Sequence, residues 1–450
     1  MTRQNDLDVP IFDLINCLSD TIDLVSPDLA DHHHRVGMIA WFLSRQLNLP
    51  PDQQTDLLFA GNLHDIGALS LSERLQLQSF DVRDTLEHAE TGALLLEMFT
   101  PLAGIADMVR FHHVRWEDGA GAYCRGREVP EEARILHLAD RIAVLLGTMD
   151  KAHVLCQARD IRDRIASESG SMFNPALVTV FLNLAERESF WLGIAFPAIN
   201  PLYEQVARLR IVHLDTEGVI GLSRMFARII DFRSRFTATH STGVATIAEN
   251  LACLAGMSAM ECSQMRIAGL LHDLGKLVVP AELLEKPGTL TEQEQYVIRC
   301  HSYFTNRALH NISSFGEIAK WSSYHHEHLD GSGYPFHISG RDLPLGARIV
   351  SVSDVFTAIM EDRPYRAGMD RLKSESVIDA MVADSALDAD VVALLTTHFD
   401  ELNGARITAQ QKAQQEYAEL CDTITALNAD TACARLKGSR RPLRTRGVPY

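Results

Sequence analysis

The chain has 450 residues, of which 46% are hydrophobic and 22% charged, and its formal net charge is −17 at pH 7. This length predicts two domains of roughly 200 residues each, and the acidic balance excludes a general DNA or RNA binder, which needs clustered cations. No apolar run reaches the roughly 20 residues that a membrane-spanning helix requires, and the first ten residues show no secretory signal.

The predicted elements are almost all helices. Apolar residues recur at helical spacing in both halves of the chain, namely at Val36, Ile39, Ala40, Leu43 and Leu47, and at Val244, Ile247, Ala248 and Leu251. Thr291 and Glu294 have the spacing of a capping box, which predicts the start of a helix that carries His301. Loops rich in Gly and Pro are expected at 285–290 and 330–346. The predicted fold class is therefore all-α.

The last part of the chain has two features of its own. Ala413, Tyr417, Leu420, Ile424 and Leu427 alternate steps of four and three, which predicts a helix that packs in a homodimer or, alternatively, against its own domain. The basic segment 438–447 is predicted to be disordered. The eight cysteines form no CxxC pair, which favours free thiols and a cytoplasmic protein.

The histidines repeat between the two halves. His32 precedes His64 by the same 32 positions that separate His240 from His272. Ten of the 19 histidines follow such paired spacing, and ARILHLAD at 133–140 mirrors ARIVSVSD at 347–354. The chain is therefore predicted to be an internal duplication. Its expected parts are a first domain at 1–205, a catalytic domain at 206–405, and a C-terminal helix and tail at 406–450.

Histidine and aspartate in this pattern predict metal binding, because imidazole binds Zn, Fe, Mn or Ni and a carboxylate bridges two ions. The candidate ligands of the second half, here called the second cup, are His240, His272, Asp273, His301, His325, His326 and Asp354. Seven ligands suit two ions that share Asp273. The equivalent set, here called the first cup, is His32, His64, Asp65, His88, His112, His113 and Asp140, and it predicts further metal in the first domain.

HDLGK at 272–276 and HHEHLDGSGYP at 325–335, with Gly333, Tyr334 and Pro335 intact, resemble the HD-GYP family of phosphodiesterases. The resemblance covers about residues 215–405. It implies tandem HD-type helical domains, a centre of two divalent metals, usually iron or manganese, and hydrolysis of cyclic di-GMP, or of cyclic GMP-AMP in related members. It also implies a bacterial signalling role beside diguanylate-cyclase-type proteins.

The same resemblance assigns residue roles. One metal is expected on His240, His272, Asp273 and Asp354, and the other on Asp273, His301, His325 and His326. Asp273 and Lys276 are the expected catalytic residues, with Lys276 as a fixed cation facing the phosphate. The expected substrate contacts are Lys276, Tyr334, Arg363 and Arg366, although the two arginines also suit surface salt bridges. Phe236 and Thr357 stand where some members have carboxylates, which favours two metals over three.

The first half departs from the family pattern. Ala68 replaces the lysine, Val114 replaces the glutamate after the paired histidines, and 118–123 lacks Gly-Tyr-Pro. Asp28 offers a carboxylate where the second half has Phe236. The first domain is therefore expected to be regulatory or structural. For the whole chain, the alternatives are a signalling module that binds a nucleotide or partner protein without turnover, and a nucleotidase acting on mononucleotides.

Overall fold

A computed structural model describes residues 6–26, 29–68, 70–82, 86–147, 153–196, 212–232, 239–286, 288–362 and 367–438, with side chains as far as residue 426. The described residues are mostly helical and contain almost no sheet, so the predicted all-α class is confirmed. Their strands form two short antiparallel pairs, β1 (Val9–Pro10) with β4 (His213–Leu214) and β2 (Tyr123–Cys124) with β3 (Arg127–Glu128).

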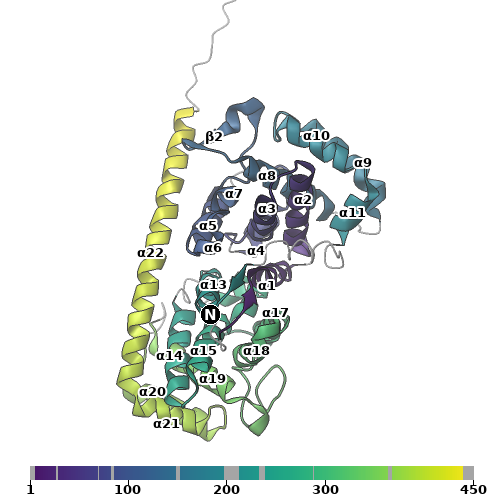
Figure 1. Ribbon diagram of the computed structural model, residues 1–450. Coiled ribbons are helices and arrows are strands. Elements are labelled where there is room, and N and C mark those ends of the chain that lie inside the picture. The colour runs from purple at the N-terminus through teal and green to yellow at the C-terminus, as the bar shows by residue number, and fades with distance from the viewer. Residues whose placement is uncertain are drawn as a thin grey trace, which may run out of the picture.

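The first half, drawn in purple to blue in Figure 1, surrounds the first cup with α2, α3, α5, α7 and α8. Its helices are α1 (Ile11–Asp23), α2 (His32–Gln46), α3 (Pro51–Leu63), α4 (Leu71–Leu77), α5 (Leu86–Glu97), α6 (Thr100–Ala103), α7 (Ala106–Arg110), η2 (Glu117–Ala122), α8 (Glu131–Gly147), α9 (Val154–Ser167), α10 (Pro175–Leu184) and α11 (Glu188–Ala195). Val36, Ile39, Ala40 and Leu43, which were predicted to share one face of a helix, are buried in α2, and Leu47 is the C-cap of this helix.

The second half repeats this order. Its helices are α13 (Thr216–Asp231), α14 (His240–Leu254), α15 (Ala259–Leu271), η5 (Leu274–Val278), α16 (Ala281–Leu284), α17 (Glu292–His310), η6 (Ser313–Phe315), α18 (Gly316–Ser323), η7 (Gly340–Asp342), α19 (Leu345–Met360), α20 (Arg371–Ala383), α21 (Ala389–Thr397) and α22 (Phe399–Gly438). The helix pairs α2/α14 and α3/α15 begin and end at positions that differ by the same 208 residues. The structure therefore shows the duplication element by element.

Local sequence sets where the helices of the second half begin. Thr291 accepts a hydrogen bond from Glu294 N at 3.3 Å, and the Glu294 carboxylate accepts from Thr291 N at 2.8 Å, so the predicted capping box is confirmed. Ser258 and Glu261 form a second capping box at the start of α15. These caps satisfy first-turn N–H groups and so help to fix the register in which α15 and α17 present the histidines at positions 272 and 301.

The two halves are joined along an extended surface. β1 pairs with β4, and Leu7 N donates to Thr216 Oγ1 at 3.2 Å. Helix α1 packs against α17 and η5 of the second half, and α22 runs along both halves (Figure 1). Buried apolar residues of both halves belong to one continuous core. The predicted boundary at 205/206 lies outside the described residues, and α22 passes through the predicted boundary at 405/406 without a break.

Two expectations need correction or qualification. The prediction of free thiols is wrong for Cys253 and Cys262, which form a disulfide because the turn between α14 and α15 brings them together, with Cα atoms 5.8 Å apart. In the predicted dimer seam, Tyr417 packs on Phe232 of its own chain with ring centroids 4.7 Å apart, which favours the alternative of packing within the chain. The residues of the basic segment from 439 onward lie outside the described residues.

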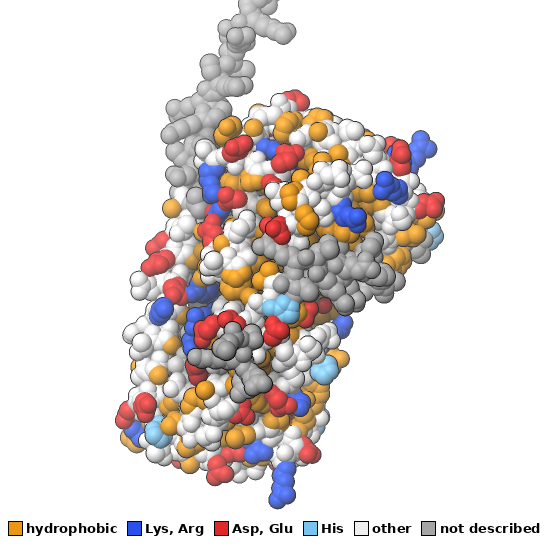
Figure 2. Space-filling model, in the orientation of Figure 1, with side chains coloured by type: hydrophobic (Ala, Val, Ile, Leu, Met, Phe, Trp, Pro, Cys, Tyr) orange, Lys and Arg blue, Asp and Glu red, His pale blue; other side chains and the backbone are white. Residues whose placement is uncertain are grey.

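The surface carries both signs of charge. On the described part of the face in Figure 2, Lys and Arg side chains are interspersed with Asp and Glu and form no continuous basic stripe. This agrees with the exclusion of general nucleic-acid binding. Within the described ranges, no helix combines the length and the apolar character that crossing a bilayer requires.

Candidate metal centres

The second cup collects its seven predicted ligands from five helices. His240 is the first residue of α14, His272 caps the end of α15, and Asp273 follows it. His301 lies within α17, the paired histidines follow α18, and Asp354 lies within α19, so residues 114 positions apart meet in one cluster. In this cluster, ligand atoms of three overlapping sets lie within 4.8 Å of one another: His240/His272/Asp273, His272/His325/Asp354 and His301/His325/His326.

The carboxylates lie between the imidazoles. Asp273 Oδ2 is 3.2 Å from His272 Nε2, while its Oδ1 is 3.4 Å from His301 Nε2. Asp354 Oδ1 is 3.0 Å from His240 Nε2 and 4.0 Å from His272 Nε2. Because the two oxygens of Asp273 face different histidines, this side chain is placed to bridge two ions.

Hydrogen bonds to the backbone orient the histidine rings so that the remaining ring nitrogen, Nε2, is directed into the cup. The Nδ1–H groups of His272, His301 and His325 donate to backbone carbonyls three residues earlier, at 2.8, 2.7 and 2.6 Å. This leaves each Nε2 as the ligand atom, which is how backbone partners orient metal-binding histidines. Among the described residues, the buried Nε2 of His272 has no hydrogen-bond partner. A buried polar atom of this kind fits a metal ligand, since most buried polar groups are otherwise satisfied.

Charge within the second cup is divided unevenly. Burial lowers the pKa of His301 to about 4 and that of His326 to about 3, so both rings are neutral donors at pH 7. Burial also opposes the charged form of His240, but Glu361 and Asp354 raise its pKa to about 10. Burial favours neutral Asp273, yet His272 and Lys276 hold its pKa well below the ordinary value. The cup therefore presents anionic carboxylates beside mostly neutral imidazoles.

Lys276 lies at the rim of the second cup. Its Nζ donates to Asp273 Oδ2 at 2.5 Å, and a quarter of the side chain is exposed. Burial opposes its charge, but Asp273 outweighs this effect and raises the pKa of Lys276. The lysine therefore holds a fixed positive charge between the ligands and the solvent.

The Gly-Tyr-Pro loop is fastened to the same cup. The buried Glu327 carboxylate accepts hydrogen bonds from Phe336 N at 2.6 Å and Ile338 N at 3.1 Å. Tyr334 N donates to His326 O at 3.0 Å, and the two rings stack with centroids 4.8 Å apart. A Cβ at Gly333 would meet backbone atoms of residues 326–328, so this close approach needs glycine. The motif thus places Tyr334 directly over a candidate ligand.

The first cup repeats this arrangement. Asp65 Oδ2 is 3.3 Å from His64 Nε2, and Asp65 Oδ1 is 3.4 Å from His88 Nε2 and 3.6 Å from His112 Nε2. Ligand atoms within 4.8 Å of one another form two sets, Asp65/His88/His112/His113 and His32/His64/Asp140. Within the part of the chain that the structure describes, five buried candidate ligand atoms have no hydrogen-bond partner, namely Nε2 of His32, His64 and His112 and Oδ1 of Asp65 and Asp140. The first cup therefore also fits metal.

Some predicted residues are not reached by the structure, and some neighbours were not predicted. Arg363, Arg366, Phe236 and Asp28 lie outside the described residues. Thr357 is buried, and its methyl group faces Gly243.

Sequence analysis missed Glu361, whose carboxylate lies 3.2 Å from His240 Nδ1, and Arg299, whose guanidinium lies 5.0 Å from the Tyr334 ring centroid. Neither residue has a counterpart or spacing in the sequence that points to the cup.

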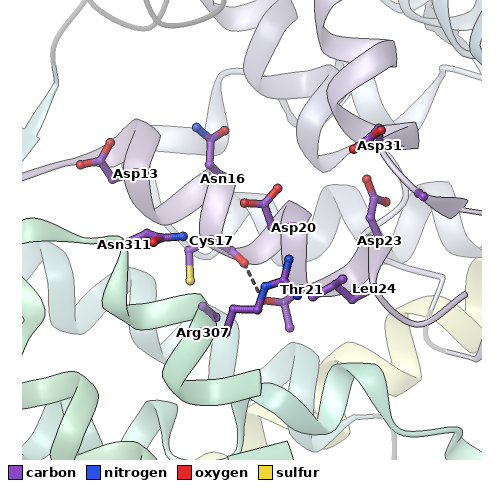
Figure 3. Close-up of a pocket in the computed structure, with 12 residues that line it drawn as sticks. Asp13, Asn16, Cys17, Asp20, Thr21, Asp23, Leu24, Asp31, Arg307 and Asn311 are labelled. Carbon is purple, nitrogen blue, oxygen red and sulfur yellow. Dashed lines mark hydrogen bonds between the residues drawn. The ribbon is translucent and has the colours of Figure 1, made fainter. Parts of the chain in front are cut away.

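A pocket of about 450 Å³ lies between the two halves, apart from both clusters of ligands. Its lining, drawn in Figure 3, includes Asp13, Asn16, Asp20 and Asp23 of α1 together with Arg307 of α17 and Asn311 at the C-cap of α17. Asp23 connects this pocket with the first cup, because its carboxylate binds the Nδ1 of His33, the neighbour of His32.

Comparison with known proteins identifies similar chains. The HD domain family matches residues 16–176 and 224–391. The 3′3′-cGAMP-specific phosphodiesterase 1 of Vibrio cholerae is 30% identical over 390 residues, which are 83% of this chain and 88% of the relative. The cyclic di-GMP phosphodiesterase response regulator RpfG of Xanthomonas campestris is 39% identical over 32% of this chain and 39% of its own. A crystal structure of a V. cholerae cyclic GMP-AMP-specific phosphodiesterase, V-cGAP3, shares the fold with a TM-score of 0.61, at 24% identity over 88% of this chain and 98% of that chain.

Proposed function

Because the chain belongs to the HD domain family, we propose that it is a metal-dependent phosphodiesterase that hydrolyses a cyclic dinucleotide. The family resemblance drawn from the HD and Gly-Tyr-Pro motifs is confirmed by these relatives. The observation that carries the proposal is the convergence of seven candidate ligands with Lys276 and the Gly-Tyr-Pro loop in the second cup. A binding module without turnover has no need of this full set.

The relatives also bear on the choice of substrate. Those named for 3′3′-cGAMP match 83%, 60% and 52% of this chain, whereas those named for cyclic di-GMP match about a third of it or less. The motifs alone placed cyclic di-GMP first. We now place 3′3′-cGAMP first and keep cyclic di-GMP as the second substrate, with the linear dinucleotide, the mononucleotides or both as product.

The donor set suits two divalent cations. Imidazole nitrogens and carboxylate oxygens are compatible with iron or manganese, the metals that the family resemblance implies, and Asp273 would be shared between the ions. When bound, such a pair would supply an activated water and positive charge for the phosphoryl group. The chain's own residues then position the substrate: Lys276 holds a positive charge beside Asp273, and Tyr334 offers a phenol whose pKa burial raises, so that its O–H stays a donor. Arg363 and Arg366 are proposed as further contacts with phosphate or guanine.

Several further features belong to this proposal. A cytoplasmic location and diguanylate-cyclase-type signalling partners follow from the kind of substrate. The three-part division of the chain places turnover in residues 206–405 and a regulatory or structural role in 1–205. The homodimer through α22 stays a prediction, and a strictly monomeric mass by light scattering at micromolar concentrations would contradict it.

Product analysis tests the function directly. The full chain, with its iron and manganese quantified, is incubated separately with 3′3′-cGAMP and cyclic di-GMP, and the products are separated by chromatography. We expect linear dinucleotide or mononucleotide to form, faster from 3′3′-cGAMP. If neither linear dinucleotide nor mononucleotide forms while both cups hold metal, the enzyme assignment is contradicted. Faster cleavage of cyclic di-GMP would make cyclic di-GMP the first substrate, as the motifs alone suggested.

A further inference from the structure

The first cup lacks the lysine of the second cup, but a buried arginine is hydrogen-bonded to the alanine that stands in its place. Arg74 is in α4, and only 2% of its surface is exposed. Its Nε–H donates to the carbonyl oxygen of Ala68 at 2.6 Å. Ala68 stands 208 positions before Lys276, so the arginine is fixed to the very residue that replaced the lysine. The position equivalent to Arg74 in the second half is the exposed Glu282.

The outer end of this guanidinium is unsatisfied. Both Nη1 and Nη2 are buried, and neither has a hydrogen-bond partner among the described residues. Burial lowers the pKa of Arg74 to about 10, against the opposing charges of Asp65 and Asp23, so the group remains a cation at neutral pH. Leaving a buried charged donor unpaired costs more free energy than leaving a neutral one unpaired. An anionic ligand removes that cost.

A second arginine of the first half, Arg141, has hydrogen-bond acceptors for all three of its guanidinium nitrogens. Arg141 Nε donates to Asp140 Oδ2 at 3.0 Å, and its Nη groups donate to Ser79 O at 2.6 Å and Leu77 O at 3.2 Å. Arg141 therefore ties the residues at the end of α4 to α8, which also carries the candidate ligand Asp140. This contact holds α4, and with it Arg74, beside the first cup.

We propose that the first cup is a binding site for a phosphoryl group, with the guanidinium of Arg74 supplying the positive charge that Lys276 supplies in the second cup. A guanidinium with two free NH₂ groups matches the paired oxygens of a phosphate. The choice of phosphate over other anions rests on the proposed function, whose substrate and products are phosphate esters. The first half thus exchanged a partly exposed lysine for a buried arginine, which suits retention of a ligand more than rapid turnover.

Binding is measured on the full chain with His272→Ala and Asp273→Ala, which disable the second cup, after loading with manganese. Titration calorimetry uses two probes, inorganic phosphate and the linear dinucleotide, to distinguish a free phosphate from a nucleotide end group. Adding Arg74→Gln is expected to weaken binding at least about tenfold, as the loss of one charge-assisted contact implies, while metal per chain stays constant. Arg74→Lys should retain part of the affinity. Arg159→Gln, which changes a largely exposed arginine, is the matched control. It should bind both probes with the affinity of the His272→Ala/Asp273→Ala protein.

A second measurement needs no change at Arg74. In the manganese-loaded background, ³¹P relaxation of either probe should be enhanced, and His64→Ala with Asp65→Ala should abolish the enhancement. The absence of enhanced relaxation, or equal affinity of the Arg74→Gln and background proteins for both probes, would overturn the proposal. Hydrolysis by the wild-type chain is scored separately, so a failure of this site is distinguishable from a failure of the proposed enzyme.

Discussion

Gly275 is the position where one methyl group should disturb the second cup most selectively. Its N–H donates to Thr305 Oγ1 at 2.9 Å, and this hydroxyl donates in turn to His272 O at 3.0 Å. In Gly275→Ala, the new Cβ would collide with the His301 carbonyl oxygen and lie only 2.8 Å from Thr305 N, inside the 3.0 Å limit of real Cβ contacts. Because these are backbone atoms, α17 must move, and it carries His301.

The required displacement of α17 is roughly 1 Å, and a misplacement of that size can cost about 100-fold in rate. We therefore expect Gly275→Ala to lower kcat about 100-fold and to reduce the metal content per chain. Overpacking should also lower the free energy of unfolding by about 1–3 kcal/mol. Steady-state hydrolysis, elemental analysis and denaturant unfolding measure these three effects.

Gly67→Ala is the matched control, because its Cβ would collide with the His88 carbonyl oxygen and Gly92 N of α5 in the same way. Gly67→Ala should reduce the metal content of the first cup, while the hydrolysis rate per metal-loaded second cup stays at the wild-type value. A Gly275→Ala enzyme with wild-type rate and metal content would refute the reasoning, as would a folded Gly67→Ala enzyme without activity.

Three further predictions concern the second cup. Lys276→Gln should lower kcat roughly 100-fold with unchanged metal content, as for the loss of one electrostatic donor; an unchanged kcat would contradict this. Glu327→Gln should raise KM, because an amide has one acceptor oxygen for the N–H groups of Phe336 and Ile338; the same KM would show that the loop is held otherwise. In the metal-free chain, carboxylates outweigh burial and raise the pKa of His240 to about 10, so its stabilising effect is full below pH 6.5 and lost as the pH rises through 10. The melting temperatures of wild type and His240→Gln should converge over that range, and a constant difference would contradict the assignment.

The positions of the candidate ligands could be predicted because they lie within helices or in the turns directly after them, where the sequence fixes the direction of the side chain. The duplication strengthened the prediction, since a histidine at one position was tested against the equivalent position 208 or 213 residues away. The capping box of α17 was visible for the same local reason.

Contacts between distant elements could not be predicted in this way. Glu361 reaches His240 across 121 positions, and Arg141 of α8 reaches Leu77 at the end of α4 across 64 positions. Neither residue is repeated in the other half, so the duplication offered no signal. The apolar seam on α22 left a homodimer and packing within the chain both open, and only the structure shows Phe232 against Tyr417, because periodicity shows which residues share a face and not what covers it.

The central claim, that the second cup hydrolyses the cyclic dinucleotide and the first does not, is tested most directly by two double variants. Hydrolysis rate and metals per chain are measured for His272→Ala/Asp273→Ala and for His64→Ala/Asp65→Ala in folded protein. We predict that the first pair abolishes hydrolysis, while the second lowers the metal content and changes the rate only modestly through the contact between the halves. Complete loss of hydrolysis in the folded His64→Ala/Asp65→Ala protein would contradict the claim.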